Sequence, residues 1–206
     1  MSNVSLDARQ HGLADSLRLS LVEGIGPRLR KALLERFVEP TAVLDAAPSD
    51  LRAVPGIGAE LARRITTARE QIDVAAELDV CRQHGIDILT EQSASYPRAL
   101  REIYDPPGIL FALGDLQPQD ALAIAVVGAR HATHYGTAQA ERLAGSLARA
   151  GLTVVSGLAR GIDAAAHRGA LAAGGRTIAV LGSGLLEIYP PEHGDLARQV
   201  CAAGAL

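Results

Sequence analysis

The second half of the chain contains the stretch Gly151-Leu-Thr-Val-Val-Ser-Gly-Leu-Ala-Arg-Gly-Ile-Asp-Ala-Ala-Ala-His-Arg-Gly-Ala-Leu171. It combines an apolar run at 152–155, a glycine-rich loop at 156–161 and a helical pattern over about 162–173. A short, continuous apolar run is typical of a strand in a parallel sheet that is covered on both faces. The stretch therefore predicts one strand–loop–helix unit of an α/β layer.

Two further units with the same order of strand, loop and helix flank this stretch. Their strands, loops and helices are expected at 123–127, 128–134 and 136–150, and at 176–181, 182–191 and 192–203. Repeated units of this kind predict a Rossmann-like, doubly wound parallel sheet whose crossovers are right-handed. Two short strands, at 86–90 and 109–113, are expected upstream of it.

The first half of the chain contains an internal repeat. Val22-Glu-Gly-Ile-Gly-Pro-Arg-Leu29 returns as Val54-Pro-Gly-Ile-Gly-Ala-Glu-Leu61, and amphipathic helices are expected after each copy, at 27–37 and 59–68. Two glycines around one isoleucine predict a tight turn with the isoleucine pointing inward. We therefore expect a tandem helix-hairpin-helix domain over 1–85, followed by a Rossmann-like domain over 86–206.

Composition limits the classes of function. The chain has 206 residues, 48% of them hydrophobic, and a net charge of only −3, so no bulk positive field is available to hold nucleic acid. The two cysteines form no pair or motif that would indicate a disulfide framework or a zinc ribbon. The N-terminus has no apolar signal-peptide core, and no later apolar run is long enough for a membrane span. We expect a cytoplasmic protein without membrane contact.

Three loops of the expected sheet carry groups that could hold an anion. They lie beyond the carboxyl ends of parallel strands, where ligands bind in open α/β sheets. Glycines let backbone N–H groups approach an anion, and helix N-termini and arginines add positive charge. The candidate phosphate-binding residues are Gly128, Arg130, Ser156, Gly157, Arg160, Gly161, Asp163, Gly182, Ser183 and Gly184. Ordinary tight turns are the alternative interpretation of each loop.

Several chemistries find no support in the pattern. The loops contain neither a GxGxxG fingerprint nor a Walker A sequence, so no cofactor is expected. Asp163, His167, His131 and His134 lack the spacing of a metal site. Asp163 is instead interpreted as a helix cap and His167 as a packing or hydrogen-bonding residue. Ser156 lacks a nucleophile elbow, so no catalytic residue is expected.

Two further groups could contact a nucleic acid. Tyr135 and Tyr189 flank the glycine loops and could stack on bases, with a buried tyrosine as the alternative. The Gly-Ile-Gly hairpins could present N–H groups to a phosphate. The first half of the chain is acidic, however, which favours a structural or protein-docking role for the hairpins.

A family resemblance rests on a long block of residues. Val126-Val-Gly-Ala-Arg130, Tyr135-Gly136, the stretch 151–171, Gly175–Gly184 and Ile188-Tyr-Pro-Pro191 together resemble the DNA-processing protein A (DprA/Smf) family. The segments Ser95–Leu100 and Pro106–Leu110 also fit the leading half of the family's pattern. The hairpin region resembles the sterile-alpha-motif-like (SAM-like) domain that some members carry.

The resemblance implies a function. Members bind single-stranded DNA with little sequence preference, protect incoming strands during natural transformation and help to load the RecA recombinase in place of single-strand-binding protein. They are DNA-binding mediators and not metabolic enzymes. The family's phosphate-contacting arginine corresponds to Arg130, and its Ser-Gly-x-x-x-Gly-Ile-Asp loop to Ser156, Gly157, Gly161 and Asp163, with Arg160 at a variable position of that loop. RecA, single-strand-binding protein and a second copy of the full-length chain are the implied protein partners.

The chain departs from the family pattern at its end. The family's Rossmann-like domain continues past the position of Leu206, so we expect a C-terminally truncated domain with an unpaired strand edge. One alternative is a nucleotide hydrolase or phosphoribohydrolase of the lysine-decarboxylase-like (LOG) type, although its Pro-Gly-Gly-x-Gly-Thr stretch is missing from these residues. A scaffold protein whose hairpins bind partners is another.

Overall fold

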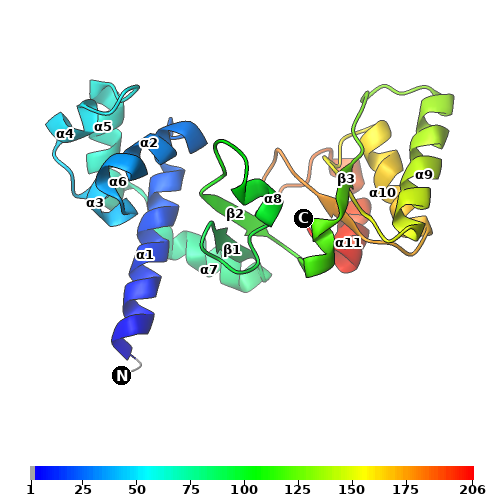
Figure 1. Cartoon of the computed structure of the whole chain (residues 1–206), viewed down its shortest axis with the longest axis horizontal. Helices are drawn as coiled ribbons and strands as arrows, with labels where there is room; N and C mark the ends of the chain where they lie inside the picture. Colours follow the sequence, from blue (N-terminus) through cyan, green and yellow to red (C-terminus); the bar gives the residue numbers. More distant parts are fainter. Residues whose placement is uncertain (1–2) are drawn as a thin grey trace. The chain divides into compact units, whose positions relative to one another are not determined.

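The chain forms two compact units, Met1–Leu110 and Phe111–Leu206. The computed structural model describes residues 3–206, and their side chains from Gly12 onward. Figure 1 shows helices throughout the first unit and a sheet with flanking helices in the second. The domain boundary expected at residue 86 falls inside the first unit and stays a prediction.

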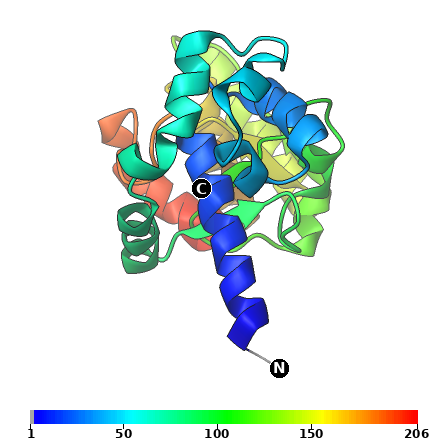
Figure 2. The ribbon, with the colours of Figure 1, turned by 90° about the vertical axis from the view of Figure 1, so that its left-hand side faces the viewer.

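The first unit is built mainly from helices. They are α1 (Asn3–Leu21), α2 (Pro27–Phe37), α3 (Pro40–Leu44), α4 (Pro48–Arg52), α5 (Ala59–Thr66), α6 (Ala68–Gln71) and α7 (Val74–His84). In Figure 2, α1 extends from the cluster of α2 to α6 toward the N-terminus. The two expected hairpins are confirmed, because Ile25 and Ile57 are buried and Gly24 and Gly56 take the positive φ angles of 99° and 90°.

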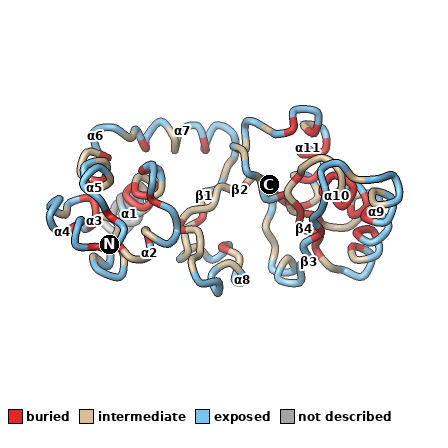
Figure 3. The backbone as a smooth tube through the Cα atoms, turned by 90° about the horizontal axis from the view of Figure 1, so that it is seen from above, coloured by how far each residue is buried: buried red, intermediate tan, exposed pale blue. Residues whose placement is uncertain are grey.

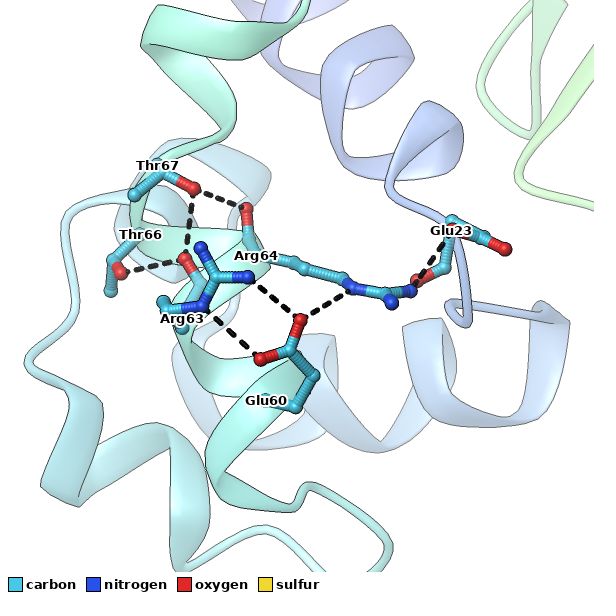
Figure 4. Close-up of polar contacts among 6 residues, drawn as sticks. All are labelled: Glu23, Glu60, Arg63, Arg64, Thr66 and Thr67. Atoms are coloured by element: carbon cyan, nitrogen blue, oxygen red, sulfur yellow. Dashed lines mark hydrogen bonds and ion pairs between the residues drawn. The ribbon is translucent and has the colours of Figure 1, made fainter.

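A polar cluster joins the two hairpin repeats (Figure 4). Arg64 of α5 donates to the carbonyl and the carboxylate of Glu23 in the first hairpin, at 3.3 and 3.1 Å. Glu60 accepts from both Arg63 and Arg64 on the same helix. These side chains are largely exposed, so the buried apolar residues of the two repeats stabilise the unit more than this cluster does.

Two short strands complete the first unit and lead into the second. Gly85 ends α7 in the left-handed conformation, which glycine adopts without steric cost. Strands β1 (Asp87–Thr90) and β2 (Ile109–Ala112) pair in a two-stranded sheet, and α8 (Arg98–Arg101) lies between them in sequence. The Tyr96 hydroxyl donates to the carbonyl of Pro107 at 2.7 Å and so fixes the turn before β2.

The second unit contains the expected parallel sheet, in the order β3-β4-β5. Its elements are η1 (Pro118–Ala121), β3 (Ala123–Ala125), α9 (His134–Arg149), β4 (Thr153–Ser156), α10 (Ile162–Ala172), β5 (Thr177–Ala179), η2 (Pro191–His193) and α11 (Gly194–Ala203). Ile124 lies opposite Val154, and Val155 lies opposite Ile178. The fold class, a Rossmann-like sheet preceded by a helix-hairpin-helix domain, is confirmed.

Helices cover one face of this sheet. Val126 and Val154 are buried against α9 and α10, and Ala179 is buried against α10 and α11; Figure 3 shows the buried positions on β4 and α10. Successive strand residues point to opposite faces, and the neighbours Val127 and Val180 are 69% and 65% exposed. Val155 and Ile178, which point to this second face from within the strands, are half-buried, so among the described residues the second face is covered less than the first.

The two sides of the sheet also differ. Beyond β5, Ala205 forms a parallel bridge to Ile178 and an antiparallel bridge to Gly114, so this side is extended. On the other side β3 is an edge strand, and all three of its residues are exposed. Within the described chain, the unpaired strand edge expected from the sequence is thus β3.

An ion pair between Asp120 and Arg176 lies at the amino edge of the sheet. The Asp120 carboxylate accepts from Arg176 Nε and a terminal guanidinium nitrogen, both at 2.9 Å, and from the Thr153 hydroxyl at 2.7 Å. Burial alone would raise the pKa of Asp120, but hydrogen bonds from Arg176, the Gln117 amide and Thr153 outweigh burial and lower it. These contacts join the residues that precede or begin β3, β4 and β5.

Candidate functional site

The loops after β3 and β4 interlock at the carboxyl edge of the sheet. The Ile162 amide donates to the carbonyl of Ala129 at 3.2 Å. Gly161 has a φ of 76° and lies against the carbonyls of Ala129 and Arg130, where a side chain would overlap the backbone. Only glycine fits this position, and it holds Arg130 close to the N-terminus of α10.

Asp163 joins the same two loops from below. It is buried, and its carboxylate accepts from the amides of Gly128 at 3.3 Å and Gly157 at 3.0 Å. Gly161 is the N-cap residue of α10, and no side chain caps this helix. The interpretation of Asp163 as a cap of its own helix is therefore wrong, because the carboxylate bonds the two loop amides instead.

Ser156 also supports the loops. Its hydroxyl is buried and donates to the carbonyl of Val126 at 2.7 Å, which ties the end of β4 to β3. In this structure Ser156 and Asp163 hold loop backbone, and the Gly128 and Gly157 amides face Asp163. A phosphate contact by any of these four residues stays a prediction.

Other donors at this edge are available. Arg130 is exposed, and its guanidinium forms no ion pair or hydrogen bond with any residue that the structure describes. The amides of Ala129 and Arg130, in the first loop, and of Arg160 and Gly161, in the second, likewise donate to no described residue. An arginine beside unpaired amides at a helix N-terminus is a suitable site for an anion.

Arg160, by contrast, already has an anionic partner. Its Nε and a terminal nitrogen donate to the two carboxylate oxygens of Glu192 at 2.6 and 3.0 Å, and its other terminal nitrogen donates to the Tyr189 hydroxyl at 3.4 Å. The hydrogen bond from Arg160 lowers the pKa of Glu192. Arg160 therefore links the second loop to the third.

A second link connects the same loops. The buried side chain of His193 hydrogen-bonds through Nδ1 to the carbonyl of Leu158 at 2.8 Å. Gly182, Ser183 and Gly184 lie in the third loop, before this link, and Gly182 and Gly184 are exposed. Sequence reasoning missed Glu192 and His193, because neither belongs to a glycine-rich motif and only the folded loops bring them to Arg160 and Leu158.

Both candidate stacking residues are on the surface. Tyr135, near the start of α9, is 75% exposed, and Tyr189 is 58% exposed with the Arg160 guanidinium 5.5 Å from its ring centre. The alternative that these tyrosines are buried is wrong. Base stacking by either ring stays a prediction.

His167 lies in the core beneath the loops, as expected of a packing and hydrogen-bonding residue. The Thr177 hydroxyl donates to the Val154 carbonyl at 2.8 Å, so it accepts from His167 Nδ1 at 2.7 Å. Burial lowers the pKa of His167 to about 4, and its Nε2 has no partner in the described structure. Among the described residues, no three His, Cys, Asp or Glu side chains lie together in a metal-binding cluster.

Comparison with protein families gives two matches. The family described as DNA recombination-mediator protein A matches residues 87–206. The SAM-like helix-hairpin-helix tandem matches residues 16–70. These two matches cover the sheet with its loops and the hairpin repeats.

Curated proteins with DprA or Smf names match this chain over part of their own length. Protein Smf of Synechocystis sp. is 37% identical over 194 residues, which are 92% of this chain and 49% of that protein. DNA processing protein DprA of Streptococcus pneumoniae is 47% identical over 95 residues, or 46% of this chain and 33% of that protein. The chain thus spans about half, or less, of the length of these relatives.

Two solved structures resemble the chain. DNA processing protein A from Streptococcus pneumoniae has a TM-score of 0.71 and 31% identity, and the match covers 92% of this chain and 64% of that one. DNA processing protein A from Helicobacter pylori, described for its single-stranded DNA binding mode, has a TM-score of 0.51 and 30% identity, and the match covers 58% of this chain and 53% of that one.

Within residues 3–206, no helix has both the length and the apolar character needed to span a membrane.

Proposed function

Since this chain belongs to the family of DNA recombination-mediator protein A, we propose that it binds single-stranded DNA at the carboxyl edge of the second-unit sheet and mediates recombination without catalysing a reaction. The observation that carries this proposal is the unpartnered Arg130 beside the free amides of Ala129 and Gly161. The Helicobacter pylori relative, described for its single-stranded DNA binding mode, supports the class of ligand.

The residues of the site divide into two roles in this proposal. Arg130, Arg160 and the free loop amides contact phosphates directly, and the glycine loop 182–184 lets the strand approach closely. Ser156, Asp163 and the amides of Gly128 and Gly157 keep the loops in place beneath them. Tyr135 and Tyr189 provide exposed rings on which bases can stack.

A site of this kind is independent of sequence. Contacts to phosphate position a strand but carry no information on its bases. Stacking also tolerates every base, because each has a π face. Binding therefore weakens as salt concentration rises, since bound phosphates release their counterions.

The wider role follows from the family and is part of the proposal. We propose that the whole protein acts in the cytoplasm, where it protects incoming single strands during natural transformation. It would then help to load RecA in place of single-strand-binding protein, and it would self-associate in its full-length form. The chain covers about half of its relatives, so these activities belong to the full-length protein.

The direct test measures binding of a single-stranded and a double-stranded oligonucleotide at two salt concentrations. Arg130→Ala is expected to weaken single-strand binding by about 1–3 kcal/mol, which is roughly 5- to 150-fold. Arg142→Ala is the matched control, because Arg142 is an exposed arginine on α9. Equal affinity of Arg130→Ala and the unsubstituted chain, or binding that ignores salt, would contradict the proposal. Release of base from nucleoside monophosphates would instead support a hydrolase.

A further inference from the structure

The two arginines at the carboxyl edge differ in one respect. Arg130 forms no ion pair with any described residue, whereas Arg160 is held by both carboxylate oxygens of Glu192. The carboxylate lies along the Nε edge of the guanidinium, and this edge is one of the two that can hold a phosphate with two hydrogen bonds. Glu192 therefore occupies one of the two positions that a phosphate could take on Arg160.

The ion pair is exposed, which makes it replaceable. The side chains of Arg160 and Glu192 are 43% and 52% exposed. Ion pairs between exposed side chains contribute little to stability, because water screens them and both side chains lose freedom. A strand that brings several phosphates to the edge at once can displace such a partner.

We propose that Glu192 is a built-in competitor for the DNA backbone: it occupies Arg160 in the free protein, and an entering phosphate takes its place. The inference rests on the proposed function and adds to it a residue that limits affinity. The Tyr189 hydroxyl accepts from the other terminal nitrogen of Arg160, which does not contact Glu192, so the exchange leaves this contact in place.

The fold does not depend on this ion pair. The third loop is held to the second by the buried hydrogen bond from His193 to Leu158, and Pro190 is buried beside it. The pair also adds little to stability because both groups are exposed. Glu192→Gln should leave the loop in place and change only the charge that faces Arg160.

The test measures the affinity for a fluorescent oligothymidine by anisotropy. Glu192→Gln is expected to bind about fivefold more tightly than the unsubstituted chain, the scale of one exposed ion pair. Glu187→Gln is the matched control, since it removes the same charge from the same loop, and Glu187 has no ion pair in the described structure. In an Arg160→Gln background, Glu192→Gln should bring no gain.

Three results would overturn the inference: unchanged or weaker binding by Glu192→Gln, an equal gain from Glu187→Gln, or a gain that persists without Arg160. If the chain binds in a way that depends on Arg130 but ignores Glu192, only this inference fails. If neither the unsubstituted chain nor Glu192→Gln binds the oligonucleotide, the proposed function fails together with it.

Discussion

The amino and carboxyl edges of the same three-stranded sheet differ in how completely their polar groups are paired. At the amino edge, Asp120 accepts hydrogen bonds from Arg176 and Thr153, and the pair is 17% and 10% exposed at its arginine and aspartate side chains. At the carboxyl edge, Arg130 is exposed and nearby amides are unpaired. A saturated edge stabilises the fold, while an edge with spare donors can bind an anion.

The strongest test of this difference removes the acid at the amino edge. Asp120→Ala should destabilise the second unit by about 1–3 kcal/mol, because the partly buried Arg176 guanidinium loses its carboxylate partner and keeps only the carbonyls of Asp115 and Ala203. Denaturant unfolding measures the loss. Asp195→Ala is the control, since Asp195 is exposed on α11. This substitution should change the free energy of unfolding by less than about 0.5 kcal/mol.

The same variant also separates stability from binding. Asp120 lies at the opposite edge from the loops, so the folded fraction of Asp120→Ala should keep its affinity for single-stranded DNA. Normal stability, or a loss of affinity in fully folded protein, would mean that the two edges do not have separate roles.

The buried histidine beneath the loops gives a pH test. His167 has a pKa lowered to about 4 in the folded protein, against 6.5 when unfolded. Between these values the unfolded chain binds a proton that the folded chain does not, so stability is full above pH 6.5 and is lost as pH falls toward 4. The expected loss between pH 7 and pH 5 is about 2 kcal/mol.

Two variants isolate this titration. His167→Gln removes the group and should flatten the dependence of stability on pH between 7 and 5, whatever its effect at pH 7. His131→Gln removes an exposed histidine and should keep the slope. The Asp120 carboxyl has a pKa below its ordinary value, so its contribution is lost only at more acid pH. Identical slopes in both variants would show that His167 does not carry the effect.

Local pattern predicted the elements of both units well. The helix expected over 162–173 is α10 (Ile162–Ala172), and the one expected over 27–37 is α2 (Pro27–Phe37). Such helix bounds follow from the spacing of apolar residues and from the positions of glycine and proline. These signals depend on only a few neighbouring residues. The apolar strands also predicted burial. The sequence of a strand does not show which elements cover its second face, and Val180 is exposed there.

The site was predicted less completely, because its contacts join distant residues. The glycine loops and the position of Arg130 followed from the order of strands. The partners of Asp163 depend on the spacing between the loops after β3 and β4, which no local pattern contains. The pairing of Arg160 with Glu192 depends in the same way on where the third loop folds back.

The smallest effect concerns an exposed ring at the carboxyl edge. Tyr135 is 75% exposed at the start of α9, so Tyr135→Ala should leave stability unchanged and weaken single-strand binding by about 1 kcal/mol, the lower end for a stacked base. Tyr135→Phe keeps the ring and should retain affinity, while Tyr104→Ala removes an equally exposed ring from the first unit and should have no effect. If Tyr135→Phe weakens binding as much as Tyr135→Ala, the hydroxyl and not the ring is responsible, and this edge then holds the strand through polar contacts alone.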